Sequence, residues 1–147
     1  MTSHTSSPLK RLPFSSERAD PGRDSASVRA AIRHAAPASA VAREAVVMQQ
    51  QNRGIHNISA DEVFIGNGVS ELIDLSLRAL LNPGDEVVIF APYFVEYKFY
   101  ISNHGGVPVV AETDESFDVD AEALAKVLTP KTKALIINTP NNPTGRL

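Results

Sequence analysis

Short apolar runs and helical periods alternate along residues 63–137. Continuous runs of Val, Ile, Leu and Phe indicate buried strands, whereas apolar residues spaced three and four positions apart indicate helices. We expect strands at 63–65, 86–90, 107–111 and 134–137, and helices at 40–53, 70–81, 95–103 and 120–128. Apolar strands that are joined by helices are typical of parallel sheets covered on both faces. The pattern predicts an α/β fold with a partial, doubly wound, mostly parallel sheet.

Turn and cap residues mark several of these boundaries. Residues 82–85 read Asn-Pro-Gly-Asp, which predicts a tight turn between a helix and a strand. Pro108 lies near the start of an expected strand and indicates a strand end or a sheet edge. Asp118 is the expected cap of the helix at 120–128.

The first 39 residues differ in character from the rest. They are rich in Ser, Arg, Ala and Pro, and the prolines interrupt any helical or strand period. Residues 1–53 hold eight Lys or Arg against four acids, whereas residues 54–147 hold six against thirteen. We expect residues 1–39 to be disordered or atypical apart from a short helix over 25–36, and residues 40–147 to form the folded domain.

Composition excludes several classes of function. A length of 147 residues suits one domain or part of one, and the net charge of -3 argues against a nucleic-acid partner. There is no cysteine, so disulfides and thiolate metal sites are excluded, and four scattered histidines indicate no metal site. No stretch approaches the roughly 18 apolar residues of a membrane span. We expect a cytoplasmic protein without a membrane partner.

The first candidate for chemistry is the loop at residues 66–71, Gly-Asn-Gly-Val-Ser-Glu, where a strand is expected to end and a helix to begin. Glycines allow close backbone approach, and a helix start offers unpaired N–H groups to an anion such as phosphate. Ser70 adds a hydroxyl. The alternative is structural, with Ser70 capping the helix and the glycines forming a turn.

Two further loops follow expected strands. Residues 91–97 contain aromatic rings that can stack on a flat heteroaromatic ligand, although Phe94 and Tyr97 are equally consistent with a helix face packed in the core. Residues 138–145 contain two prolines, a glycine, and the adjacent amides of Asn141 and Asn142. In an open parallel sheet, ligands bind beyond the carboxyl ends of the strands, which is where both loops are expected.

Together these strings resemble a known family. The order and spacing of Gly68-Val69-Ser70, of the Pro-Tyr-Phe loop at 92–94, and of Asn-Asn-Pro-Thr-Gly at 141–145 are similar to the class I and II aminotransferases of fold type I. The similarity runs over residues 43–147. It implies the N-terminal part of the large domain, which binds pyridoxal 5'-phosphate, in an enzyme that exchanges an amino group between an amino acid and a 2-oxo acid.

The resemblance also implies residue roles. Gly68, Val69 and Ser70 match the segment that holds the cofactor's phosphate, and Phe94 matches the aromatic residue that stacks on the pyridine ring, with Tyr93 as the alternative. Asn142 matches the amide that binds the phenolic oxygen of the cofactor. Family members usually act as homodimers, which we expect of the complete enzyme.

No catalytic residue is expected in this chain. The family's Schiff-base lysine and substrate-binding arginine lie well beyond the Asn-Pro-Thr-Gly string, so we expect a truncated chain that is inactive alone. The lysines of residues 54–147 match no family lysine: Lys98, Lys126, Lys131 and Lys133. Alternatives are another fold type I enzyme, such as a lyase or decarboxylase, or a non-catalytic binding or interaction module. A dinucleotide-binding domain fits less well, because Glu71 stands where a third glycine is needed.

Overall fold

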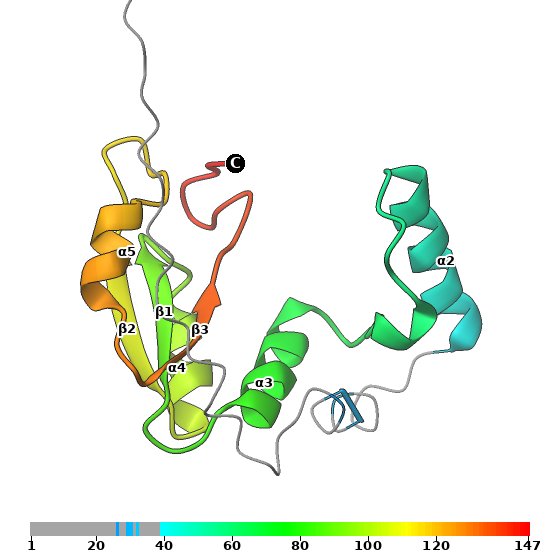
Figure 1. Cartoon of the computed structure of the whole chain (residues 1–147), viewed down its shortest axis with the longest axis horizontal. Helices are drawn as coiled ribbons and strands as arrows, with labels where there is room; N and C mark the ends of the chain where they lie inside the picture. The colour runs from blue at the N-terminus through cyan, green and yellow to red at the C-terminus, as the bar shows by residue number, and fades with distance from the viewer. Residues whose placement is uncertain (1–25, 27–28, 31, 33–38) are drawn as a thin grey trace, which may run out of the picture.

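A computed structural model describes residue 26, residues 29–30, residue 32 and residues 39–147 (Figure 1). Its sheet has three strands in the order β2-β1-β3, formed by β1 (Glu86–Ala91), β2 (Val107–Glu112) and β3 (Thr132–Ile136). Both pairings are parallel, with Glu86 opposite Val107 on one side and opposite Thr132 on the other. The predicted α/β fold with a parallel sheet is confirmed, and Pro108 lies on an edge strand as expected.

The central strand explains why the sheet forms. Val87, Val88 and Ile89 are fully buried, which is the signature of a strand covered on both faces. Successive side chains of a strand point to opposite faces. Val87 and Ile89 accordingly belong to one apolar cluster, while Val88 and Phe90 belong to another.

Helices cover the two faces unequally. On one face α3 (Val69–Leu80) and α4 (Glu96–Asn103) bury Leu77, Tyr97 and Ile101 in the cluster of Val87 and Ile89. On the other face α5 (Ala121–Val127) packs Leu124 and Val127 against Val88, Phe90 and Ala111. Figure 1 shows α5 and α4 on opposite sides of the strands. The doubly wound arrangement follows directly from the alternation of strands and helices.

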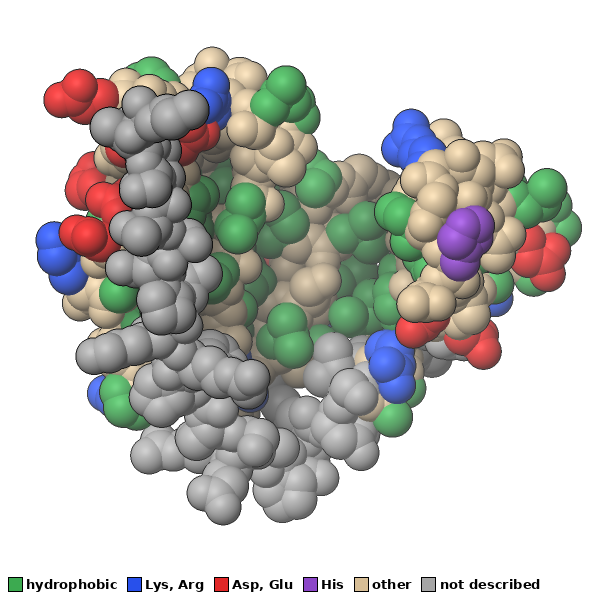
Figure 2. Space-filling view, turned by 45° about the horizontal axis from the view of Figure 1, so that its top comes forward, with side chains coloured by type: hydrophobic (Ala, Val, Ile, Leu, Met, Phe, Trp, Pro, Cys, Tyr) green, Lys and Arg blue, Asp and Glu red, His purple; other side chains and the backbone are tan. Residues whose placement is uncertain are grey.

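The N-terminal helix stands apart from this core. α2 (Ala40–Asn52) and the short 3-10 helix η1 (Ala60–Glu62) lie to one side of the sheet in Figure 1. α2 buries no residue, and its apolar side chains Val41 and Met48 are 76% and 64% exposed. Figure 2 shows hydrophobic side chains gathered in the hollow between α2 and the sheet-bearing part.

The expected strand at 63–65 is wrong. The backbone at Val63 is extended, with φ -98° and ψ 124°, but residues 63–65 pair with no strand in the described part of the chain. Val63 is nevertheless buried, and it lines a groove of about 390 Å³ together with Val46 and Leu72. The apolar run correctly indicates a buried segment. A β-strand also needs a neighbouring strand with which to form backbone hydrogen bonds, and burial alone does not provide one.

The other elements match expectation to within two residues, except at the N-terminus. Of the helix expected over 25–36, the structure describes residues 26, 29–30 and 32, which are helical, and the remainder lies outside the described residues. The disorder expected for residues 1–39 likewise falls almost entirely outside them. Among the described residues, no helix is long and apolar enough to cross a membrane.

Candidate functional site

The candidate loops meet at one edge of the sheet because of how α3 connects to β1. The turn at 82–85 joins the end of α3 to the start of β1, and Asp85 closes it by accepting the Asn82 amide at 2.8 Å. α3 has 12 residues and β1 has 6, which correspond to lengths of about 18 Å and about 20 Å. The start of α3 therefore returns to the level at which β1 ends, as Figure 1 shows.

α3 begins without a side-chain cap. Gly68 is its N-cap residue, with φ 97°, and has no side chain that could accept a hydrogen bond from the first turn. A Cβ at Gly68 would meet nothing within 4 Å, so the glycine is required by backbone conformation and the space beside it is open. Val69 is 70% exposed and Ser70 is exposed. The alternative in which Ser70 caps the helix is wrong, because Ser70 is the second residue of α3.

Glu71 places a negative charge in the first turn of α3. Its carboxylate turns back and accepts the Asn67 amide, and it passes so close to Gly66 that a Cβ there would lie 2.7 Å from Glu71 Oε2. Gly66 thus makes room for this contact. An anion bound at the start of α3 would lie near the Glu71 carboxylate, which is already hydrogen-bonded to the Asn67 amide.

Phe94 lies in the turn between β1 and α4 and is half-buried. Its ring meets Tyr97 edge-to-face, with centroids 5.7 Å apart and planes at 79°. Tyr97 is a core residue, 7% exposed, and burial raises the pKa of its hydroxyl. The core alternative is therefore right for Tyr97, while Phe94 is held against the core and keeps part of its surface open. Tyr93 lies beneath Lys98, whose Nζ is 5.1 Å from the ring centroid.

Tyr100 lies on α4 near the start of α3. Its hydroxyl donates to the Glu96 carboxylate, and the side chain of Ser70 is near enough to lower its pKa. The hydrogen bond to Glu96 is the main reason that the pKa of Tyr100 is raised above its ordinary value. Sequence analysis did not single out Tyr100, because nothing local distinguishes it from other aromatic residues of α4.

Asn142 lies in the turn after β3, and its side chain is exposed. The turn is held by Asn138 Oδ1, which accepts the Asn142 amide at 2.8 Å, and by the Gly145 amide, which donates to the Asn141 carbonyl at 2.7 Å. Asn141 Nδ2 donates to the Pro92 carbonyl at 3.1 Å. This contact joins the loop after β3 to the loop after β1, a role that two adjacent asparagines do not reveal in sequence.

A cavity of about 100 Å³ lies beside these loops. Its lining includes Tyr93, Asn138 and Asn141, but none of Gly68, Val69, Ser70, Phe94 or Asn142. The candidate residues therefore lie outside this cavity, with Gly68, Val69, Ser70 and Asn142 exposed and Phe94 half-buried.

Known proteins resemble this chain in sequence and in fold. The chain matches the family described as aminotransferase class I and II over residues 35–147. A probable aspartate/prephenate aminotransferase of Thermus aquaticus is 39% identical over 105 residues, covering 70% of this chain and 27% of that protein. A glutamate-pyruvate aminotransferase of Escherichia coli K12 is 40% identical over 106 residues, covering 71% of this chain and 26% of that protein.

Solved structures show the same relationship. A tetra mutant of Thermus thermophilus aspartate aminotransferase superposes with a TM-score of 0.71 at 34% identity, covering 80% of this chain and 36% of that one. The aspartate aminotransferase of Thermotoga maritima gives a TM-score of 0.66 at 40% identity, covering 70% and 28%. This chain thus spans about a quarter to a third of the length of these relatives. The chain belongs to the class I and II aminotransferases.

Proposed function

We propose that residues 40–147 supply the pyridoxal-phosphate-binding loops of an enzyme that moves an amino group between an amino acid and a 2-oxo acid. The observation that carries the proposal is the meeting of three segments at one sheet edge. The Asn141 bond to Pro92 joins two of them, and the third, at the start of α3, lies at the level at which β1 ends (Figure 1). Family membership supplies the reaction class.

The first part of the proposed site would hold the phosphate. The uncapped start of α3 offers its first backbone N–H groups and a positive dipole end, which favour an anion. Gly68 leaves open space there, and the Ser70 hydroxyl lies on the same turn. We assign Gly68, Val69 and Ser70 to this role.

The second part would orient the heterocycle. Phe94 offers a ring already fixed by its edge contact with Tyr97, and Asn142 offers an exposed amide on a turn tied to the loop of Phe94. A ring can stack on a flat heteroaromatic group, and an amide can donate to a phenolic oxygen. When bound, pyridoxal phosphate acts as an electron sink for the amino acid's bonds. This chain's residues would bind and orient it.

We also infer that this chain binds the cofactor without a covalent bond. Lys98 lies over the Tyr93 ring, and it matches no Schiff-base lysine of the family. The other possible reactions of fold type I enzymes, lyase and decarboxylase chemistry among them, share these loops, so the amino acid substrate is left open.

Titration of the full chain with pyridoxal phosphate, followed by the change in the cofactor's absorbance, tests the assignment. Pyridoxal without phosphate should bind far more weakly, because a hydrogen bond to a charged group contributes about 1.5–3 kcal/mol. Ser70→Ala and Asn142→Ala should each weaken binding about tenfold. Ser76→Ala, later in α3, and Asn52→Ala, in α2, are matched controls.

Borohydride reduction of the mixture separates the two modes of binding. Saturable binding with no reduced lysine adduct supports the proposal as stated, and a reduced adduct at a specific lysine would contradict the non-covalent part. Equal affinity for pyridoxal and its phosphate would overturn the phosphate site at α3.

A further inference from the structure

We propose that Arg146 is a positioning residue for the cofactor: by pairing with Asp118 it fixes the turn at 141–145, which presents Asn142. The inference rests on the proposed function of Asn142 and concerns how its turn is held. Neither Arg146 nor Asp118 is among the residues that would touch the cofactor.

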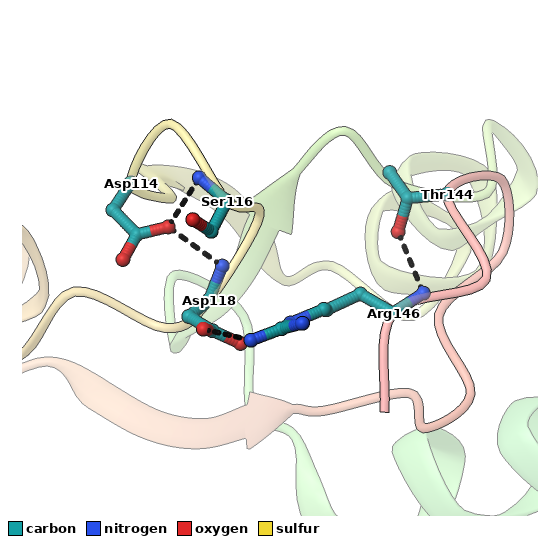
Figure 3. A network of polar contacts seen from close by, with 5 residues as sticks. All are labelled: Asp114, Ser116, Asp118, Thr144 and Arg146. Carbon is teal, nitrogen blue, oxygen red and sulfur yellow. Dashed lines mark hydrogen bonds and ion pairs between the residues drawn. The ribbon is translucent and has the colours of Figure 1, made fainter.

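The contact between the two side chains is two-pronged (Figure 3). Arg146 Nε donates to Asp118 Oδ1 at 2.6 Å, and a terminal guanidinium nitrogen donates to Asp118 Oδ2. Two parallel N–H···O bonds fix orientation as well as distance. The pair joins residues 28 positions apart, so it links two loops that follow different strands. In sequence Asp118 was expected to cap α5, but that cap is Asp120, which accepts the Glu122 amide at 2.8 Å.

Asp118 is itself held in place. The Asp114 carboxylate accepts the amides of Ser116 and Asp118 at 2.8 and 2.9 Å, as Figure 3 shows. Thr113 forms an antiparallel bridge with Val119, which closes this loop at its base. Asp118 therefore offers its carboxylate from a loop that is already folded.

The same loop is anchored to the central strand. The Thr113 hydroxyl donates to the carbonyl of Ala91, the last residue of β1, at 2.7 Å. A shift of Asp118 would therefore require a change at the end of β1, next to the loop that carries Phe94.

The backbone of Arg146 is hydrogen-bonded to the turn that carries Asn142. Its carbonyl accepts the Asn141 amide at 2.7 Å, and its amide donates to Thr144 Oγ1 at 3.2 Å. Asn141 in turn donates to the Pro92 carbonyl. These contacts form a continuous network. It begins at Ala91, passes through Thr113, Asp118, Arg146 and Asn141, and ends at Pro92, the residue after β1.

The Asp118–Arg146 pair is expected to fix the position of the turn at 141–145 more than to stabilise the fold. The side chains of Arg146 and Asp118 are 48% and 43% exposed, and exposed ion pairs contribute little to folding. Loops that bind ligands lose affinity when they must be ordered on binding, so holding the turn in advance favours the cofactor. Loss of the pair should change cofactor affinity while leaving the unfolding transition nearly unmoved.

Pyridoxal phosphate affinity of the full chain tests this, with Arg146→Ala, Asp118→Ala and the exchanged pair Asp118→Arg/Arg146→Asp. At low salt each single alanine variant should weaken binding about two- to fivefold, and the exchanged pair should recover most of the loss. The deficit of Arg146→Ala should shrink at high salt, because salt screens exposed pairs. Arg53→Ala, at the end of α2, is the charge-matched control.

Two results would overturn the inference: unchanged affinity in both alanine variants at low salt, or an exchanged pair that binds no better than either alanine variant. If the unaltered chain binds no pyridoxal phosphate, the proposed function fails and the positioning role is judged by hydrogen exchange alone. The amides of 141–145 should then exchange faster in Arg146→Ala and recover in the exchanged pair. Identical exchange in all variants would reject the role.

Discussion

α2 and α3 are helices of nearly equal length, 13 and 12 residues, but they are held in place by different interactions. α2 buries no residue and is capped by Ser39, whose hydroxyl accepts the Ala42 amide at 3.2 Å. α3 has no side-chain cap and instead buries Leu77 against β1. A helix that buries little depends more on local bonds, whereas a helix packed on the sheet can leave its start uncapped. The first N–H groups of α3 are therefore left without a side-chain partner, which is the feature on which the proposed phosphate site rests.

The largest expected effect comes from the central strand. Ile89→Ala removes a fully buried side chain from β1 and should lower the free energy of unfolding by about 2–5 kcal/mol. Met48→Ala on α2, where the side chain is 64% exposed, should change it by no more than about 0.5 kcal/mol. Urea unfolding followed by circular dichroism measures both. Equal losses would contradict this difference, because they would show that the Met48 side chain is buried in solution.

The next largest difference in stability is expected between two glycines, one packed beside the sheet and one after α2. A Cβ at Gly106 would lie 2.7 Å from Leu81 Cδ1 and 2.9 Å from Ile101 Cγ2, so Gly106→Ala should destabilise the chain by about 1–3 kcal/mol. Gly54, after α2, has φ 86° and open space around it. Gly54→Asn should be nearly neutral, because Asn tolerates the left-handed region. Thermal unfolding compares the pair, and a neutral Gly106→Ala would mean that α4 and α3 separate easily.

Removing a cap should affect the two regions differently. Ser39→Ala and Asp120→Ala each delete a side-chain acceptor at a helix start, with an expected cost of about 1 kcal/mol. For Ser39 the loss should be confined to faster amide exchange within α2. For Asp120 it should reach the amides of β1 and β2, because α5 packs on the sheet. Exchange measured by mass spectrometry distinguishes local from global opening.

The smallest effects concern acid pH. Hydrogen bonds from Arg146 lower the pKa of Asp118 below 3.8, and hydrogen bonds from Ser59 lower that of Glu62 below 4.5. Because each carboxyl has a lower pKa in the folded state than in the unfolded state, its contact stabilises the fold at any pH above the ordinary pKa. This contribution is lost as the pH falls through the lowered pKa of the folded state. Titration followed by carboxyl NMR shifts should place both groups below their ordinary values. Arg146→Ala should return Asp118 alone to about its ordinary pKa, and a return of Glu62 as well would contradict this separation.

Local pattern was sufficient for most of the elements. The apolar run at 86–90 predicted β1, and the alternation of strands and helices predicted a parallel sheet with helices on both faces, because burial on two faces leaves a continuous apolar run. The same reasoning failed at 63–65, where the side chain of Val63 is buried but no strand pairs with it among the described residues. Pairing depends on a distant segment, which a local run cannot specify.

By itself the sequence determined most of the elements, their order, and the family to which the chain belongs, since these follow from periodicity and short strings. Only the tertiary structure decided which of two nearby polar residues makes a given hydrogen bond. Asn141 ties two loops together while Asn142 stays exposed, and Asp118 pairs with Arg146 instead of capping α5. The physical reason is that a polar side chain has several possible partners of similar strength, and the fold selects among them by bringing one within hydrogen-bonding distance.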